Sequence, residues 1–462
     1  MENPAVPVPK ESFPRVFWSA NITELFERAA YYAIASFVVI YLGQMGLGNY
    51  WPSVLNGLLW YLVYFLPILS GTIADQVGFR RALLVAFVLL AIGYFLMGYP
   101  VWFGGHGLSE GAEKSDLVTA GSDIVVPVLL GILLIGMGGS VIKPCISGTV
   151  QKTAGARATL AFGIFYMVIN IGSLVGRSIS YVMRKQFDLS YIYAVATGCS
   201  IVAFFVVMIL YKDPDKVGYA SATAKPRKSV GRILADMVLV LRNLRFALFL
   251  LVSSGFFFIY SQVYNVLPLY VKKVVEKDPP MDIYTMANPL VIVLFQLMIT
   301  RAFGKMKPIK SIIVGIIIIG VSMLINLAPI FSAQGVRALT LGNLLPIGSL
   351  FIVLTVGLIA FGELFTSART YEYIGALAPK GQEGLFLGYA NLPMAIGALV
   401  GGPVGAFIFN EIMCRNHKVL PNGLLELDPW QNAFGWLILM GVGFLSAVSM
   451  WAYNRWLERH PV

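Results

Sequence analysis

The 462-residue chain is poor in charge, cysteine and histidine. Only 12% of its residues are charged, about half the share of an ordinary soluble domain, whereas 58% are hydrophobic. Three cysteines, two of them inside long apolar runs, allow no disulfide framework and no CxxC metal site. The three histidines lie in polar segments, so we expect no zinc site and no buried imidazole relay. Proton chemistry therefore has to use carboxylates.

The sequence also lacks the motifs of common catalytic sites. It contains no Walker loop and no HExxH motif. No set of nucleophile, base and orienting group can be assembled from it either. We expect the protein not to be an enzyme, and to use neither a metal nor an organic cofactor.

Long apolar stretches dominate the chain instead. A membrane-spanning helix needs about 20 mostly apolar residues, and twelve such stretches predict an all-α membrane protein with twelve transmembrane helices in a lipid bilayer. They lie at residues 17–45, 51–75, 80–103, 123–151, 158–183, 190–211, 245–271, 283–304, 309–331, 345–377, 383–412 and 431–457.

A basic polar segment divides these helices into two sets of six. Residues 212–244 form the longest polar connection, which predicts a six-helix bundle at 1–211, a cytoplasmic linker and a second six-helix bundle at 245–462. With both termini in the cytoplasm, most lysines and arginines fall in cytoplasmic loops, as the positive-inside rule requires. Topology thus explains the net charge of +11, and we expect no nucleic-acid partner.

Ionisable residues inside the predicted spans are the main functional signal. Such groups are costly in lipid, so they pair or line water, and they mark functional sites by default. A purely structural ion-pair network is the alternative interpretation. The residues concerned are Glu24, Glu27, Arg28, Lys143, Arg177, Glu363, Arg369 and Glu372.

The first predicted helix carries a polar stripe. Polar residues between Asn21 and Tyr32 recur at spacings of three and four, which places them on one helix face. Glu27 and Lys143 come to similar depths in the membrane, so we expect that they can meet. A carboxylate paired with a cation stays ionised, whereas one separated from its partner in an apolar environment takes up a proton. The pattern predicts a proton switch.

At these residues the chain resembles the proton-dependent oligopeptide transporter family of the major facilitator superfamily. Glu24–Tyr32 is similar to the family's ExxER motif with its following tyrosines. Gly138–Ser147 is similar to its glycine-rich segment ending in KPxxS, and Phe165–Leu174 to its FYxxINxGS signature. Further similar positions are Gln262, Asn288–Pro289 and Gly362–Pro379, and Gly71–Arg81 resembles the superfamily's cytoplasmic gating motif.

The resemblance implies a major facilitator superfamily fold, in which two six-helix bundles rock around a central site. It implies a proton-coupling network of Glu24, Glu27, Arg28 and Lys143. In the substrate cavity, the glutamate at position 363 faces the amino terminus of the substrate. The cavity residues implied are Tyr31, Tyr32, Tyr64, Asn170, Gln262, Asn288, Glu363 and Ser367, and the gating residues are Gly71, Asp75, Gly78, Arg80 and Arg81.

The sequence departs from the family pattern where peptide carriers hold the substrate carboxylate. Ala35 and Ser261 stand at the positions of the usual arginine and of the acid that answers it. Conversely, Arg177 and Arg369 are charges that the pattern does not contain. Because a guanidinium binds a carboxylate or phosphate with two parallel hydrogen bonds, either arginine is a candidate substrate anchor. For Arg369, a salt bridge with Glu372 is the alternative.

Three hypotheses remain open from the sequence. The leading one is a proton-coupled symporter that imports a small peptide-like or zwitterionic solute by alternating access, acting as a monomer in a bacterial inner membrane with protons as the coupling ion. The second keeps the protons but gives a non-peptide organic anion as substrate. The third is a non-transporting membrane sensor on the same scaffold.

Overall fold

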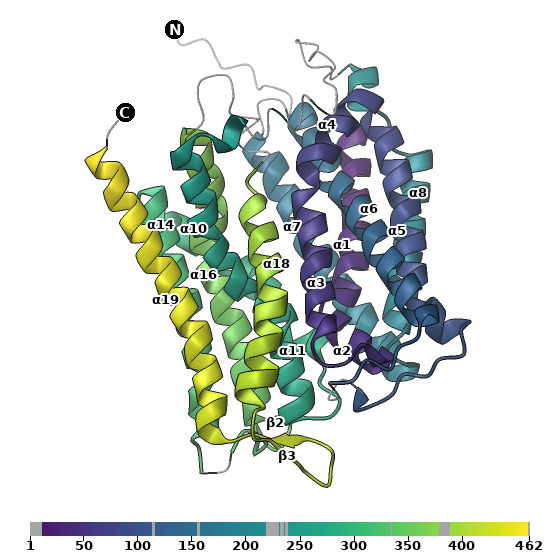
Figure 1. The fold of residues 1–462 in the computed structure, drawn as a ribbon. Helices are drawn as coiled ribbons and strands as arrows, with labels where there is room; N and C mark the ends of the chain where they lie inside the picture. Colours follow the sequence, from purple (N-terminus) through teal and green to yellow (C-terminus); the bar gives the residue numbers. More distant parts are fainter. Residues whose placement is uncertain are drawn as a thin grey trace.

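The chain folds into a bundle of long helices with two short hairpins (Figure 1). The structure is a computed structural model, and it describes residues 12–112, 116–154, 158–218, 231, 235, 239–333, 335–377 and 389–460. Among these residues, eleven helices are long and apolar enough to cross a membrane, or twelve if one bent pair counts as a single span. The predicted all-α membrane fold is confirmed.

The first half of the chain contains the bent span. Its two parts, Arg15–Ala35 and Val38–Leu47, meet at 51°. Gly46, near the end of the second part, and Gly48, just after it, take positive φ angles. Pro67 begins α4 and so separates it from α3, because proline has no N–H to donate inside a helix. The elements are α1 (Arg15–Ala35), α2 (Val38–Leu42), η1 (Gly43–Leu47), α3 (Trp51–Phe65), α4 (Pro67–Val77), α5 (Phe79–Trp102), α6 (Ser122–Ala154), α7 (Ala158–Gln186), α8 (Tyr191–Ile209) and η4 (Pro214–Val217).

The second half contains more broken helices. Its first span runs from α10 through a 3₁₀ turn into α11 and ends in a π-helical turn. The elements are α10 (Leu244–Ser261), η5 (Gln262–Tyr264), α11 (Val266–Tyr270), η6 (Val271–Val275), α12 (Met281–Tyr284), α13 (Ala287–Phe303), α14 (Pro308–Leu324), α15 (Leu327–Ile330), β1 (Leu339–Thr340), β2 (Leu345–Pro346), α16 (Ile347–Leu377), α18 (Leu392–Phe407), η7 (Ile408–Met413), β3 (Lys418–Val419), β4 (Leu425–Glu426) and α19 (Pro429–Arg459).

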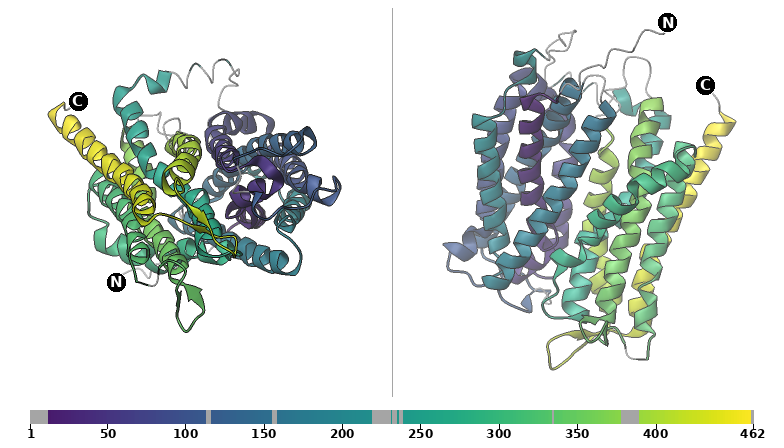
Figure 2. Two further views of the ribbon diagram at one scale, coloured as in Figure 1. Left: turned by 60° about the horizontal axis from the view of Figure 1, so that its bottom comes forward. Right: turned by 180° about the vertical axis from the view of Figure 1, so that it is seen from behind.

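The helices of the two halves stand side by side, as both views in Figure 2 show. We call the end where α1 begins and α19 ends the terminal end, and the end that carries the antiparallel β1–β2 and β3–β4 pairs the hairpin end. The bounds predicted for the two bundles stay a prediction, because most of the linker lies outside the described residues.

Glycines allow the closest approaches between helices. On α18, a Cβ at Gly397, Gly401 or Gly405 would lie within 2.7 Å of an atom of α10 or η5, so these glycines let the helices pack closely. The two halves meet where α3 crosses α18. There a Cβ at Gly57 would lie 2.7 Å from the Ala398 carbonyl oxygen, and a Cβ at Gly402 would lie 2.2 Å from that of Ser53. Backbone therefore rests directly on backbone at this crossing.

Candidate functional site

Three ionisable residues of α1 form a buried cluster. Glu24, Glu27 and Arg28 are 0%, 2% and 5% exposed. The Arg28 guanidinium donates to both carboxylate oxygens of Glu27, from Nε at 2.5 Å and from Nη2 at 2.7 Å. Such a two-pronged, charge-assisted contact is among the stronger polar interactions in proteins. The polar stripe predicted for this helix thus contains one tightly bonded ion pair.

The Glu24 carboxylate is held much more loosely. Its Oε1 lies 3.6 Å from Arg28 Nε, and neither of its oxygens accepts a hydrogen bond from the described residues. A buried polar group without a hydrogen bond needs a physical explanation. One is that Glu24 is the acid able to take up or release a proton without breaking the Glu27–Arg28 contact.

Lys143 lies on α6 and is partly buried. Its Nζ lies 5.7 Å from the centre of the Tyr64 ring. Within the described part of the chain, no carboxylate lies within 4.0 Å of Lys143. Glu27 is paired with Arg28, although the matching depths of Glu27 and Lys143 had suggested that these two can meet.

Aromatic rings from both bundles surround Trp60 of α3. The ring centroids of Tyr31, Tyr64, Tyr260 and Tyr264 lie 4.8–6.4 Å from that of Trp60. Tyr31 and Tyr64 were expected here, whereas Trp60, Tyr260 and Tyr264 were not. Nothing in the sequence separates these three rings from the many aromatic residues that simply pack in helices.

Glu363 occupies a polar position on α16. Asn288 Nδ2 donates to its Oε2 at 3.3 Å, and Ser367 Oγ donates to its Oε1 at 3.4 Å. The structure therefore brings together three of the expected cavity residues. Both contacts are long for hydrogen bonds, and no cation among the described residues pairs with Glu363 within 4.0 Å, so its charge is left with little compensation.

Two further expected cavity residues make local contacts. Asn170 donates to the Tyr166 carbonyl one turn earlier on α7, at 2.9 Å. Gln262 is fully buried, and its Nε2 donates to the carbonyl oxygens of Phe258 and Gly401. The Gln262 amide nitrogen is thus directed at the α18 backbone, whereas its Oε1 accepts no hydrogen bond from the described residues. Its predicted contact with substrate stays a prediction.

Arg177 of α7 is fully buried, and within the described part of the chain its hydrogen bonds go only to hydroxyl groups. Its Nε donates to Ser173 Oγ at 3.2 Å, and its Nη1 donates to Ser36 Oγ at 2.9 Å. The same Nη1 donates to Thr285 Oγ1, and Nη2 donates to Tyr264 Oη at 3.2 Å. Thr285 and Tyr264 belong to the second half of the chain. In this arrangement Arg177 joins the two bundles and has no free face for a substrate carboxylate.

The guanidinium of Arg177 also lies 4.8 Å from the centre of the Tyr32 ring. Tyr32 in turn packs edge-on against Tyr31, with ring centroids 5.2 Å apart. Arg177 therefore contacts the aromatic cluster around Trp60 through Tyr32 and through Tyr264. We expect a change in the contact between the bundles at Arg177 to move these aromatic rings.

Other polar contacts join the bundles closer to the hairpin end. Arg184 donates to Asp278 at 2.5 Å and to Asp282 at 3.5 Å, and Lys185 donates to Asp278 at 2.5 Å. Partial burial acts to raise the pKa of Asp278, but the hydrogen bond from Lys185 and the charge of Arg184 outweigh it and hold that pKa below its usual value. On α3, Asn56 donates to the Tyr264 carbonyl at 2.9 Å.

Arg369 has a different environment from the one proposed for a substrate anchor. Its Nη1 pairs with Glu372 at 2.6 Å, and its Nη2 donates to the carbonyl oxygens of Phe303 and Gly304 at 3.3 and 2.7 Å. These carbonyls end α13, where a cation is favourable because of the unsatisfied acceptors and the helix dipole. Arg369 therefore links α16 to the end of α13, as the salt-bridge alternative expected.

The turn between α4 and α5 holds the expected gating residues. Gly78 has a φ of +93°, and a Cβ there would lie 2.6 Å from Asp213 Oδ2. Asp213 also accepts from the Phe79 N–H at 3.1 Å, and Arg80 donates to the Met208 carbonyl at 2.7 Å. These contacts fix the turn to the end of α8. Gly71 packs against Pro144 of α6, Arg81 is exposed, and the side chain of Asp75 lies outside the described residues.

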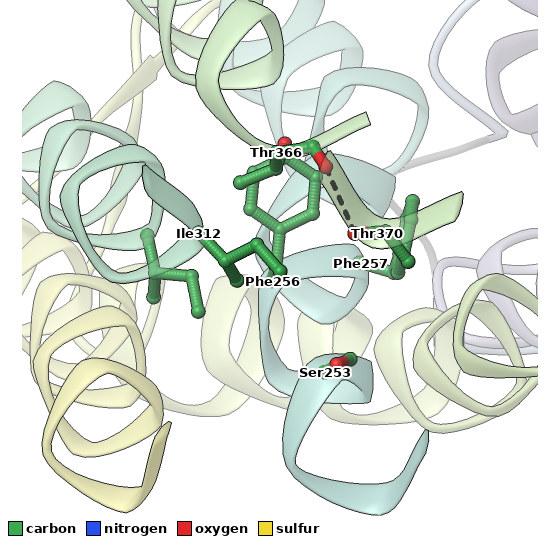
Figure 3. Close-up of a pocket in the computed structure, with 7 residues that line it drawn as sticks. Ser253, Phe256, Phe257, Ile312, Thr366 and Thr370 are labelled. Carbon is green, nitrogen blue, oxygen red and sulfur yellow. Dashed lines mark hydrogen bonds between the residues drawn. The ribbon is translucent and has the colours of Figure 1, made fainter. Parts of the chain in front are cut away.

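The second bundle also contains a cavity, which cannot hold a solute. It lies between α10, α14 and α16 and is lined by Ser253, Phe256, Ile312, Thr366 and Thr370, among others (Figure 3). Its volume is about 10 Å³, which is room for about one water molecule. The Thr370 hydroxyl that borders it donates to the Thr366 carbonyl at 2.9 Å.

Comparison with known proteins gives the same family as the motifs. A dipeptide and tripeptide permease B of Shigella dysenteriae is 24% identical over 99% of this chain and 98% of its own length. The crystal structure of a mutant peptide transporter POT in complex with alafosfalin matches with a TM-score of 0.74 at 18% identity, covering 98% of this chain and 97% of that one.

A POT family transporter in complex with 5-aminolevulinic acid has a similar fold, with a TM-score of 0.73 at 17% identity over 96% of this chain and 98% of that one. The resemblance to the proton-dependent oligopeptide transporter family is confirmed by these relatives. A family profile described as Major Facilitator Superfamily matches residues 68–371. The chain is accordingly a multi-pass membrane protein that belongs to the major facilitator superfamily of transporters.

Proposed function

We propose that the protein is a proton-coupled symporter that imports a small peptide-like or zwitterionic solute by alternating access. The observation that carries the proposal is that two acids on helices of the two halves are weakly held: Glu24 accepts no hydrogen bond from the described residues, and Glu363 accepts two long ones. Lys143 is the cation that we propose exchanges one acid for the other. Such an exchange couples the protonation of one group to solute binding at the other.

Glu24 is the proposed proton acceptor. It is fully buried, accepts no hydrogen bond within the described part of the chain and lies 3.6 Å from Arg28. Protonation removes its charge and so weakens its attraction for Lys143. Lys143 then becomes available to the carboxylate of a solute, while the Glu27–Arg28 contact persists.

Glu363 is the proposed partner of the solute's amino group. Asn288 and Ser367 orient its carboxylate through long contacts that an ammonium group can supplement. A zwitterion placed between Glu363 and Lys143 satisfies both charges at once. The names of the relatives are consistent with this chemistry, because they include permeases of dipeptides and tripeptides and a transporter bound to 5-aminolevulinic acid.

Alternating access requires one end to be closed while the other opens. The polar contacts between the bundles described above lie toward the hairpin end, with Arg177 as the deepest of them. We assign this end to the outside and the terminal end to the cytoplasm of a bacterial inner membrane, from the distribution of lysines and arginines. With this assignment the structure corresponds to an inward-facing state of the cycle. We propose that the protein functions as a monomer with protons as the coupling ion.

The organic-anion alternative receives less support from the geometry. It depended on Arg177 or Arg369 as an anchor, and both guanidinium groups are engaged by protein oxygens. Lys143 remains as a cation for an anionic solute, but Glu363 then has no partner to bind. A zwitterion satisfies the charges of both Lys143 and Glu363.

Uptake into proteoliposomes tests the proposal. A pH gradient, acid outside, is expected to drive accumulation of a labelled dipeptide by the wild-type protein. Glu363→Gln should abolish this uptake, because the ammonium group loses its acid. Glu372→Gln is the matched control, since Glu372 lies on the same helix but is exposed and paired with Arg369. Equal uptake with and without the pH gradient would refute proton coupling, and full activity of Glu363→Gln would refute the assigned site.

A further inference from the structure

A second cavity lies at the hairpin end, on the seam between the bundles. Its volume is about 310 Å³, at the lower end of the range of about 300–1,000 Å³ for small-molecule sites. The first half of the chain contributes residues of the bent first span, of the loop before α6 and of the end of α7, and the second half contributes Lys272, Asp278 and Pro279. It is separate from Glu363 and Lys143, which do not line it.

Two buried polar side chains in its wall have spare hydrogen-bonding capacity. Lys272 is 9% exposed, and its ammonium group donates to the carbonyl of Lys277, which uses one of its three N–H bonds. No carboxylate of the described residues lies within 4.0 Å of it. A second spare donor is Arg184 Nε, which is buried and has no hydrogen-bond partner among the described residues. Gln44, which is 6% exposed, lines the same wall. Buried polar groups are normally satisfied, so Lys272 and Arg184 point to a ligand.

The rest of the wall defines the chemistry of that ligand. Glu110 and Asp188 line the cavity and are exposed, so they place acidic groups toward its mouth. Phe37 and Ile40 supply buried apolar surface. Arg184 also lines the cavity; Asp278 and Asp282 engage its Nη1 and Nη2, and only its Nε is without a partner among the described residues.

We propose that this cavity binds a small zwitterionic solute with an apolar side chain, such as a hydrophobic amino acid. The carboxylate binds Lys272 and the Gln44 amide, the ammonium group lies between Glu110 and Asp188, and the side chain packs on Phe37. Because the ligand contacts both bundles, it favours the state in which they are joined at the hairpin end. Binding of the ligand to this cavity does not depend on the proposed transport function. Its effect on the joined state of the two bundles does rest on that function.

Titration calorimetry of the purified full-length protein with phenylalanine, without any ion gradient, tests the site. Phenylalanine is also a zwitterion of the kind proposed for the central site, so all variants are compared in the Glu363→Gln background, in which the central site is removed and binding to this cavity should remain. Lys272→Gln should weaken binding by about tenfold or more, and Gln44→Leu gives an independent second variant. Lys310→Gln, an exposed lysine at the start of α14, is the matched control and should bind as the wild type does.

The specificity of the ligand is tested in the same experiment. N-acetylphenylalanine, which lacks the ammonium group, and phenethylamine, which lacks the carboxylate, should each bind at least tenfold more weakly than phenylalanine. Wild-type affinity in both Lys272→Gln and Gln44→Leu would overturn the proposal, as would loss of all phenylalanine binding in Glu363→Gln. Failure of proton-driven uptake with this binding intact would refute the transport function and leave the site standing.

Discussion

The clearest test of how the bundles are held together is Tyr264→Phe. The hydroxyl of Tyr264 accepts from Arg177 Nη2 across the seam at 3.2 Å, and the substitution deletes that oxygen while keeping the ring that packs on Trp60. Arg177 is fully buried. In the joined state the variant therefore leaves a donor of a buried guanidinium without its acceptor, whereas in the opened state water can replace the lost oxygen.

The size of the expected shift follows from this difference between the joined and the opened state. A hydrogen bond to a charged group contributes about 1.5–3 kcal/mol, so the equilibrium should shift toward opening at the hairpin end by about 10- to 150-fold. Thr285→Val removes the second inter-bundle acceptor of Arg177 and should have an effect of similar size. In a variant that carries both changes, Arg177→Met should restore part of the joined population, because it removes the charge that has lost its partners.

Distances between spin labels on the two bundles report this equilibrium. Suitable label positions at the hairpin end are the exposed residues Val118 and Leu341, in a background without the three cysteines. Tyr270→Phe is the matched control, since the buried hydroxyl of Tyr270 accepts from Asn432 within the second bundle. Unchanged distances in Tyr264→Phe and Thr285→Val, or an equal change in the control, would refute the role assigned to Arg177.

The remaining predictions concern the α1 acids, an outer ion pair and the helix crossing. Glu24→Gln should abolish proton-driven accumulation in proteoliposomes while solute exchange persists; uphill uptake by this variant would contradict the assignment. Glu27→Gln breaks a buried ion pair and should lower the free energy of unfolding by about 3–5 kcal/mol, measured by denaturant titration. Because the hydrogen bond from Lys185 outweighs the opposing effect of burial, the pKa of Asp278 lies below its usual value of about 3.9. The contribution of Asp278 is therefore complete above that pH and is lost as the pH falls through the lowered pKa. In the Glu24→Gln variant, in which the proposed proton site is removed, label distances at the hairpin end should stay constant from about pH 8 to about pH 5. Gly402→Leu places a side chain against the α3 backbone and should reduce both folded yield and uptake, whereas Gly441→Leu, where an added Cβ meets nothing within 4 Å, should be neutral.

Hydropathy predicted the helices because spanning the membrane constrains length and composition directly. It did not predict the 51° bend of the first span, because the sequence there is apolar on both sides of the break. Depth along a helix was also predictable, since each residue adds about 1.5 Å. Rotation about the helix axis was not predictable, so matching depths alone did not show whether Glu27 and Lys143 face each other; Glu27 pairs with its neighbour Arg28 on the same helix.

The family resemblance identified Glu363 and its neighbours Asn288 and Ser367, which lie together. It offered no guide to Arg177, because the pattern has no charge there. The sequence alone shows an arginine in an apolar helix, for which an anionic partner is the natural expectation. Its actual partners are hydroxyl groups from both halves of the chain, and serine, threonine and tyrosine are too common to be recognised as ligands without the fold.

The glycine crossing of α3 and α18 has a mechanical consequence. With backbone against backbone, the crossing acts as a fulcrum, and the helices on either side of it act as lever arms of unequal length. From Gly57 to the start of α3 at Trp51 is roughly 9 Å, whereas to Gly71 on α4 it is roughly 21 Å. For the same angular swing, the terminal end of this span therefore travels about twice as far as the hairpin end.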